Sequence, residues 1–116
     1  MYTELSLYIN GEFIQGSGRR EQEVLNPATN TTIGKLPHAT ISDLDLALSS
    51  AYNAFETWKH SSPLLRSQIL RKVGELILER AQEIGTNITL EQGKPLTESI
   101  SEVTVCKEHA DWHAEE

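Results

Sequence analysis

The chain has 116 residues and a net charge of −7, from seventeen acidic and ten basic side chains, with 38% hydrophobic residues. This acidic balance disfavours nucleic acid and anionic membrane surfaces, which attract clusters of lysine and arginine. No apolar run approaches the ~20 residues that a membrane-spanning helix needs, and the start lacks a signal-peptide pattern. The single cysteine, Cys106, rules out an internal disulfide and fits a reducing compartment. We therefore expect a soluble, cytoplasmic protein with no nucleic-acid and no membrane partner.

Residues 1–38 are predicted to be rich in strands. Two β-prone runs in residues 7–14 flank Asn10-Gly11, a pair that favours a type I′ turn because both central residues need positive φ. Two more strands are expected at 21–25 and 31–36, joined by an Asn-Pro-Ala-Thr turn. The Gly-Ser-Gly stretch at 16–18 is interpreted as a loop, because it lacks the third glycine and the following helix of a phosphate-binding loop.

Residues 39–116 are predicted to be helical, with about three amphipathic helices. Thr40 and Asp43 form a capping-box pattern at the first start. The helix that follows carries one apolar stripe, formed by Leu44, Leu48, Ala51, Phe55 and Trp58. Ser62-Pro63 marks the second start.

From Ser62-Pro63, apolar residues recur at helical spacing as far as Ile88, in one helix or in two collinear ones. Gly93 is expected to end this run and Pro95 to begin the last helix. That helix runs to the acidic pair Glu115-Glu116, where negative charge is unfavourable for the helix dipole. It has no glycine, proline or polar tail after it. We therefore expect a truncated chain.

Three side chains suggest reactive chemistry but support it poorly. Cys106, His109 and His113 share one side of the last helix, and thiolate and imidazole suit zinc. Structural zinc needs four ligands and there is no second cysteine, so chance spacing is the preferred interpretation. Cys106 is also a weak candidate nucleophile, because Lys107, its neighbour in sequence, does not face it on a helix. The short Arg19-Arg20 cluster is interpreted as a solvated face.

Six motifs follow one another in order along nearly the whole chain. They are LYINGEFI from residue 7, EVLNPATNTTIGKLP from 23, SDLDLALSSAYNAFETW from 42, LLRSQILRKVGELILER from 64, LEQGKPL from 90 and WHAEE from 112. Together they resemble the amino-terminal segment of the aldehyde dehydrogenase superfamily. The LEQGKPL motif is most similar to the succinate-semialdehyde dehydrogenase group.

The resemblance implies an α/β fold: residues 1–116 would be the first part of an NAD-binding domain, packed on a Rossmann-type sheet, and α+β as an isolated segment. It implies an oxidoreductase that oxidises a small-molecule aldehyde to a carboxylate with NAD or NADP, as a homo-oligomer when full length. In that chemistry a cysteine thiolate attacks the aldehyde, hydride passes to nicotinamide, and water hydrolyses the thioester. The family's catalytic and coenzyme-binding residues lie beyond residue 116. We therefore assign none here, and expect the segment alone to be inactive and to bind no coenzyme.

The resemblance also implies two lesser roles. In part of the family a monovalent cation is held by backbone carbonyls before the Asn-Pro turn and by an acid, which match Val24, Leu25 and Glu91. Such hard cations take about six oxygens, so further ligands would come from elsewhere. Glu91 can equally be an ordinary helix-end carboxylate. In some relatives the last helix lines the substrate tunnel, which would place Val105 or Cys106 there.

A second function class is an interaction module without catalysis. The apolar stripes would then be an interface to full-length dehydrogenase subunits or to another partner. Co-purification with a longer dehydrogenase chain would distinguish this class from an enzyme segment.

Overall fold

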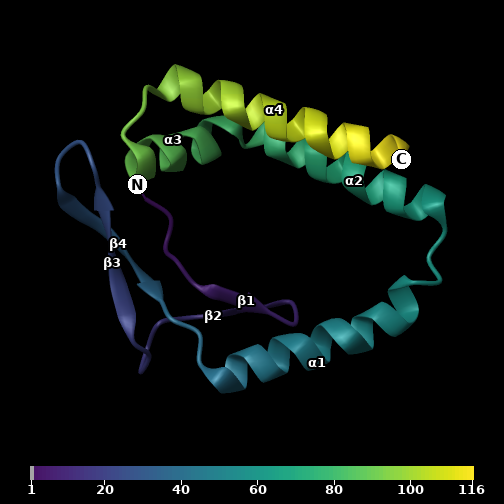
Figure 1. Ribbon diagram of the computed structural model, residues 1–116. Helices are drawn as coiled ribbons and strands as arrows, with labels where there is room; N and C mark the ends of the chain where they lie inside the picture. The colour runs from purple at the N-terminus through teal and green to yellow at the C-terminus, as the bar shows by residue number, and fades with distance from the viewer. Residues whose placement is uncertain (1) are drawn as a thin grey trace. The chain divides into compact units, whose positions relative to one another are not determined.

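The structure is a computed structural model that describes residues 2–116 (Figure 1). These residues form two compact units. A strand-containing unit runs up to Leu25 and from Asn30 to His60, and a helical unit comprises Asn26–Thr29 and Ser61–Glu116. Of the helices described, none combines the length and apolar character that crossing a bilayer requires.

The strand-containing unit begins with the predicted hairpin. Strands β1 (Leu7–Ile9) and β2 (Glu12–Ile14) pair antiparallel, with Ile9 opposite Glu12. Asn10 and Gly11 have φ of 53° and 82°, as a type I′ turn requires. The Asn-Gly prediction is therefore confirmed.

A second two-stranded sheet consists of β3 (Glu21–Asn26) and β4 (Thr31–Pro37). Both strands extend one residue beyond the predicted ranges of 21–25 and 31–36. In the turn between them, the Asn26 Oδ1 atom accepts a hydrogen bond of 2.9 Å from the Ala28 N–H. The sequence therefore located this hairpin to within one residue, because its turn chemistry is local.

Helix α1 (Ile41–Trp58) follows β4 in the same unit. Thr40 and Asp43 form the predicted capping box. The helix lies along β1, and the Ser50 hydroxyl donates a 2.7 Å hydrogen bond to the Asn10 side chain. The predicted apolar stripe is largely open to solvent, with Leu48 61% exposed and Phe55 54% exposed.

The helical unit contains three helices, α2 (Pro63–Glu79), α3 (Ala81–Gln92) and α4 (Leu96–Glu115). The chain thus has four helices in its described part where about three were expected. Of the two possibilities left open for residues 63–92, the structure has two helices, which meet at Arg80 (φ −99°, ψ 15°). Ser62 caps α2, and Gly93, at φ 74°, ends α3 as predicted.

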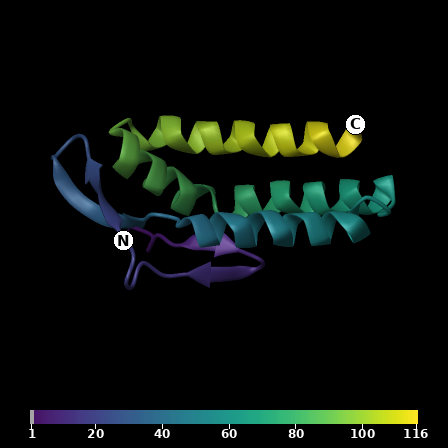
Figure 2. The same cartoon turned by 60° about the horizontal axis from the view of Figure 1, so that its bottom comes forward.

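Helices α2 and α4 run antiparallel and side by side (Figures 1 and 2). They approach closely at Gly74, where an added Cβ atom would meet the Ala110 Cβ atom at 3.6 Å. Helix α3 packs on α4 through Ser99, which is 0% exposed and lies 2.9 Å from the Thr89 hydroxyl. Val103, 1% exposed, is the most buried apolar side chain in the described part of the chain.

Candidate functional site

The three positions of the expected cation site lie on two elements. Val24 is half-buried and Leu25 is 46% exposed on β3, in the strand-containing unit. Glu91 is exposed in the last turn of α3, in the helical unit. Val24 and Leu25 belong to one compact unit and Glu91 to the other, so the cation site stays a prediction.

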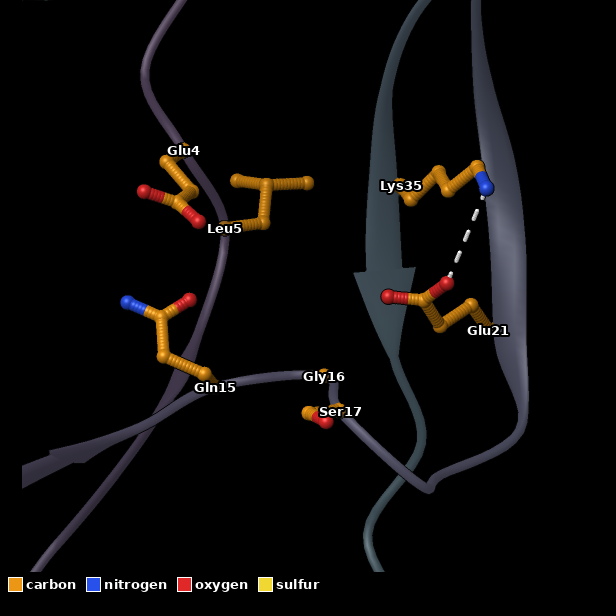
Figure 3. A pocket seen from close by; sticks show the side chains of 7 residues that line it. All are labelled: Glu4, Leu5, Gln15, Gly16, Ser17, Glu21 and Lys35. Atoms are coloured by element: carbon orange, nitrogen blue, oxygen red, sulfur yellow. Dashed lines mark ion pairs between the residues drawn. The ribbon is translucent and has the colours of Figure 1, made fainter.

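A polar pocket of about 400 Å³ opens in the strand-containing unit (Figure 3). Its lining comes from the segment before β1, the loop after β2, and strands β3 and β4: Glu4, Leu5, Gln15, Gly16, Ser17, Glu21 and Lys35. The Lys35 ammonium lies 3.8 Å from a carboxylate oxygen of Glu21. A Cβ atom on Gly16 would collide with the other oxygen of Glu21, so the absence of a side chain at Gly16 leaves room for this carboxylate.

The charge of the groups that line this pocket disfavours the binding of an anionic ligand. The lining includes two carboxylates, from Glu4 and Glu21, and one ammonium, from Lys35, which is paired with Glu21 (Figure 3). A phosphate group would be repelled there, because like charges at short range are unfavourable. The interpretation of residues 16–18 as a plain loop agrees with this electrostatic environment.

Arg19 and Asp43 form a bidentate ion pair in the strand-containing unit. The guanidinium donates two hydrogen bonds to the carboxylate, one of them 2.9 Å long from Nη2 to Oδ1. The Arg19 side chain is 19% exposed and that of Asp43 is 9% exposed. The expectation that Arg19 belongs to a solvated face is therefore wrong. Its partner lies 24 residues away, a separation for which periodicity gives no signal.

The same contact lowers the pKa of Asp43 well below its usual range. The hydrogen bond from Arg19 is the largest cause, followed by those from the hydroxyl and the backbone N–H of Thr40. These donors favour the charged carboxylate, so protonation of Asp43 must disrupt them. Ionised Asp43 therefore stabilises the fold, and this contribution depends on pH.

We expect Asp43→Asn to weaken the strand-containing unit at neutral pH and to lose this penalty in acid. Because the folded pKa lies below the unfolded value of about 3.9, the stabilisation is complete above that value and lost as pH falls through the folded pKa. Urea unfolding followed by circular dichroism at pH 7, 5, 4 and 3 should show the gap to wild type closing below about pH 4. Asp45→Asn, at an exposed position of the same helix, is the matched control. A gap that stays constant down to pH 3 would contradict this account.

The candidate reactive side chains lie on α4. Cys106 is exposed, and so is its neighbour Val105 (47%), so the choice between them for a tunnel position stays open. Within residues 2–116, no three histidine, cysteine or acidic side chains are arranged to hold a metal ion.

Comparisons with known proteins give consistent matches. Residues 13–116 match the aldehyde dehydrogenase family. Succinate-semialdehyde dehydrogenase (NADP(+)) 2 of Schizosaccharomyces pombe is 37% identical over 109 residues, covering 94% of this chain and 22% of that protein. The human mitochondrial methylmalonate-semialdehyde/malonate-semialdehyde dehydrogenase (acylating) is 39% identical over 99 residues, covering 85% of this chain and 18% of that protein.

The fold gives the same result. The crystal structure of an aldehyde dehydrogenase from Brucella melitensis biovar abortus 2308 matches with a TM-score of 0.88 at 32% identity, over 93% of this chain and 22% of that one. The short strands and four helices correspond to the N-terminal part of such structures. The resemblance inferred from the motifs is therefore confirmed. The chain spans about a fifth of the length of these relatives, 18–22% for those above.

Proposed function

Because this chain belongs to the aldehyde dehydrogenase family, we propose that it supplies the N-terminal part of an enzyme that oxidises an aldehyde to a carboxylate with NAD or NADP. The observation that most directly supports this proposal is the unequal coverage of the match, which includes 94% of this chain but only 22% of the S. pombe relative. NADP is named in that relative, which supports a nicotinamide coenzyme here. The assembled enzyme would bind its coenzyme and aldehyde largely outside this segment.

The proposed substrate is an aldehyde that also carries an acid group. Both relatives described above are named for semialdehydes of dicarboxylic acids, although one is an acylating enzyme. The LEQGKPL motif at residues 90–96 favours succinate semialdehyde within this class. We also propose a cytoplasmic homo-oligomer, which cell fractionation and light scattering of the native product would test.

The chain should have no activity of its own. Thioester chemistry needs an activated thiolate, a base and donors for the oxyanion. Cys106, the one thiol of the chain, lies exposed near the middle of the long helix α4, outside any described pocket. The segment instead contributes a scaffold, consisting of two hairpins and four helices.

A fusion protein tests this proposal. In it, residues 1–116 replace the matching segment of the S. pombe relative. The fusion should reduce NADP with succinate semialdehyde, while the 116-residue chain alone should give no reduced coenzyme above background. The relative without its own segment is the control and should be inactive. Steady turnover by the chain alone, or a folded fusion without activity, would contradict the proposal.

The cation site is part of the same proposal. The backbone carbonyls of Val24 and Leu25 and the carboxylate of Glu91 would hold a sodium- or potassium-sized ion in the full enzyme. Glu91 lies in the last turn of α3, which contains no basic residue. The assignment rests on the match of these three positions to the segments that hold the cation in part of the family. An anomalous peak beside Glu91 after thallium soaking of crystals of the intact enzyme would support the ion, and its absence would count against it.

A second candidate function is an interaction module that does not catalyse. The exposed side chains of Leu48 and Phe55 on α1 favour it, since such residues are typical of interfaces when they cluster. The size of the native product separates the two functions. A product several times larger than 13.0 kDa indicates an enzyme segment, and one of 13.0 kDa indicates a module.

A further inference from the structure

The turn of the β1–β2 hairpin contains a chemically reactive pair of residues. Of the five asparagines in the chain, only Asn10 precedes a glycine. The side-chain amide carbon of an asparagine can be attacked by the backbone nitrogen of the next residue, and a side chain on that residue hinders the attack. Gly11 has none, and both residues are exposed to water. The Asn10-Gly11 pair therefore has the composition and the exposure that spontaneous deamidation requires.

The reaction needs only water and leaves every atom accounted for. The Gly11 nitrogen forms a bond to Cγ of Asn10, and the bond from Cγ to Nδ2 breaks. Nδ2 leaves as ammonia and takes the proton of the Gly11 N–H, which leaves a cyclic imide. Water then adds to either carbonyl carbon of the imide and opens it. The products carry aspartate or isoaspartate at position 10.

The closed turn keeps the reacting atoms apart. Asn10 has φ of 53° and Gly11 has φ of 82°. A type I′ turn also sets ψ of its first central residue near +30°, as the mirror image of a type I turn. Formation of the imide needs the Cβ atom of Asn10 and the Gly11 nitrogen to eclipse each other about the Cα–C bond. In an L-residue this ψ places them nearly opposite, so the turn must open before the reaction can begin.

Helix α1 restrains the same side chain. The hairpin lies along α1 (Figure 1), and the Ser50 hydroxyl donates a 2.7 Å hydrogen bond to Oδ1 of Asn10. Cγ of Asn10 cannot swing toward the Gly11 nitrogen while this bond holds its carbonyl group on the helix. We propose that Asn10 is a deamidation site that the closed hairpin blocks, and that Ser50 is the positioning residue that keeps it blocked. Deamidation then proceeds only while the hairpin is open and detached from α1.

Deamidation of Asn10 changes the hairpin permanently, because the ammonia is lost to solvent. Aspartate at position 10 still suits the turn, since Asp-Gly is also favoured in type I′ turns. Isoaspartate carries its Cβ atom in the main chain, so the turn gains one backbone atom and no longer fits a two-residue loop. The pairing of Ile9 with Glu12 next to the turn is then weakened. The modified fraction is a lasting record of hairpin opening.

The test measures the deamidated fraction of Asn10 over time in the 116-residue chain. The chain is kept in mildly alkaline buffer with an osmolyte that favours the compact state, and the tryptic peptide of residues 1–19 is analysed by mass spectrometry. Electron-transfer fragmentation distinguishes isoaspartate from aspartate. Ser50→Ala should react about three- to tenfold faster than wild type, as expected from the loss of one hydrogen bond that opposes opening.

The adjacent serine provides the matched control. The Ser49 hydroxyl donates a 3.0 Å hydrogen bond to the carbonyl oxygen of Leu46 within α1, so Ser49→Ala should change the rate less than about twofold. Ser50→Thr keeps the hydroxyl and should retain the wild-type rate. In urea that unfolds the chain, wild type and Ser50→Ala should share one faster rate, because Asn10 and Ser50 are then out of contact.

Asn30 is an internal control in every sample. Its φ of 56° is close to that of Asn10, but the β-branched Thr31 follows it. Asn30 should therefore stay unmodified while Asn10 reacts. The proposal would be overturned if folded wild type reacted as fast as unfolded wild type, or no more slowly than folded Ser50→Ala. Reaction of Ser50→Thr as fast as Ser50→Ala would overturn the role of Ser50, and equal reaction of Asn30 would overturn the role of the Asn-Gly pair.

Discussion

Gly93→Ala is expected to lower the unfolding free energy of the helical unit by about 2 kcal/mol. Gly93 has φ of 74°, a left-handed conformation that costs a residue with a Cβ atom about 1–2 kcal/mol. In addition, the new Cβ atom would lie 3.1 Å from the Pro27 Cγ atom. The ring of Pro27 is rigid, so the turn at Asn26–Thr29 must shift as a whole to relieve the contact.

Gly18→Ala is the matched control for this prediction. Gly18 has φ of 77°, almost the same as Gly93, but an added Cβ atom would meet nothing within 4 Å. The two variants share the backbone strain and the loss of chain entropy in the unfolded state. Urea unfolding at 222 nm, in an osmolyte that favours the compact state, would measure both. If Gly93→Ala lowered the free energy of unfolding no more than Gly18→Ala does, the contact with Pro27 would not contribute to the destabilisation.

Gly85→Ala is expected to destabilise the helical unit, although alanine is the better helix former. Its Cβ atom would lie 2.9 Å from the Ile100 Cγ1 atom and 3.3 Å from the Ile100 backbone nitrogen. Overpacking of this kind costs about 1–3 kcal/mol, against a gain of about 1 kcal/mol in helix propensity. Because backbone atoms of α4 form part of the contact, rotation of the Ile100 side chain alone does not relieve it.

Gly74→Ala provides the comparison, since both glycines are buried within helices. At Gly74 the nearest atom to an added Cβ is a carboxylate oxygen of Asp111, at 3.2 Å, on a side chain that can move. The propensity gain is common to both variants, so their difference isolates the contact with α4. We expect Gly74→Ala to be neutral or stabilising. Equal midpoints in urea for the two variants would show that α3 and α4 have room to separate.

The features predicted correctly from sequence are those that neighbouring residues determine. The Asn10-Gly11 turn, the Thr40 capping box and the helix end at Gly93 each depend on groups within a few residues of one another. The helix break at Arg80 is local too, but no proline or glycine marks it, so one long helix remained possible. Local chemistry thus sets the elements and most of their ends.

Contacts between distant residues could not be predicted in this way. Arg19 and Asp43 are 24 residues apart. The residues around each of them in the sequence do not indicate that the two side chains form a bidentate pair. Ser99 lies at the centre of the α3–α4 contact, where a serine is tolerated because the Thr89 hydroxyl is its hydrogen-bond partner. The candidate cation site meets the same limit. A resemblance supplies the residues Val24, Leu25 and Glu91, whereas their meeting depends on long-range packing.

Helical periodicity also shows only that a face is apolar, and not what covers it. The stripes on α1 and α2 were located correctly, yet Leu48 and Val73 remain exposed within the described chain. A stripe of this kind is the same in sequence whether its partner lies in the same chain or beyond it.

The turn at Asn26–Thr29 has a consequence for synthesis on the ribosome. It belongs to the helical unit and contacts Gly93, although the strands on both sides of it belong to the other unit. Pro27 is made about 66 residues before Gly93, and chains grow at about 5–20 residues per second. The turn therefore waits roughly 3–13 seconds for the residue it packs against. During that interval the β3–β4 hairpin can form, but the turn at its tip cannot yet pack against Gly93. A pause in translation between these positions would lengthen the exposure of the tip to chaperones and proteases.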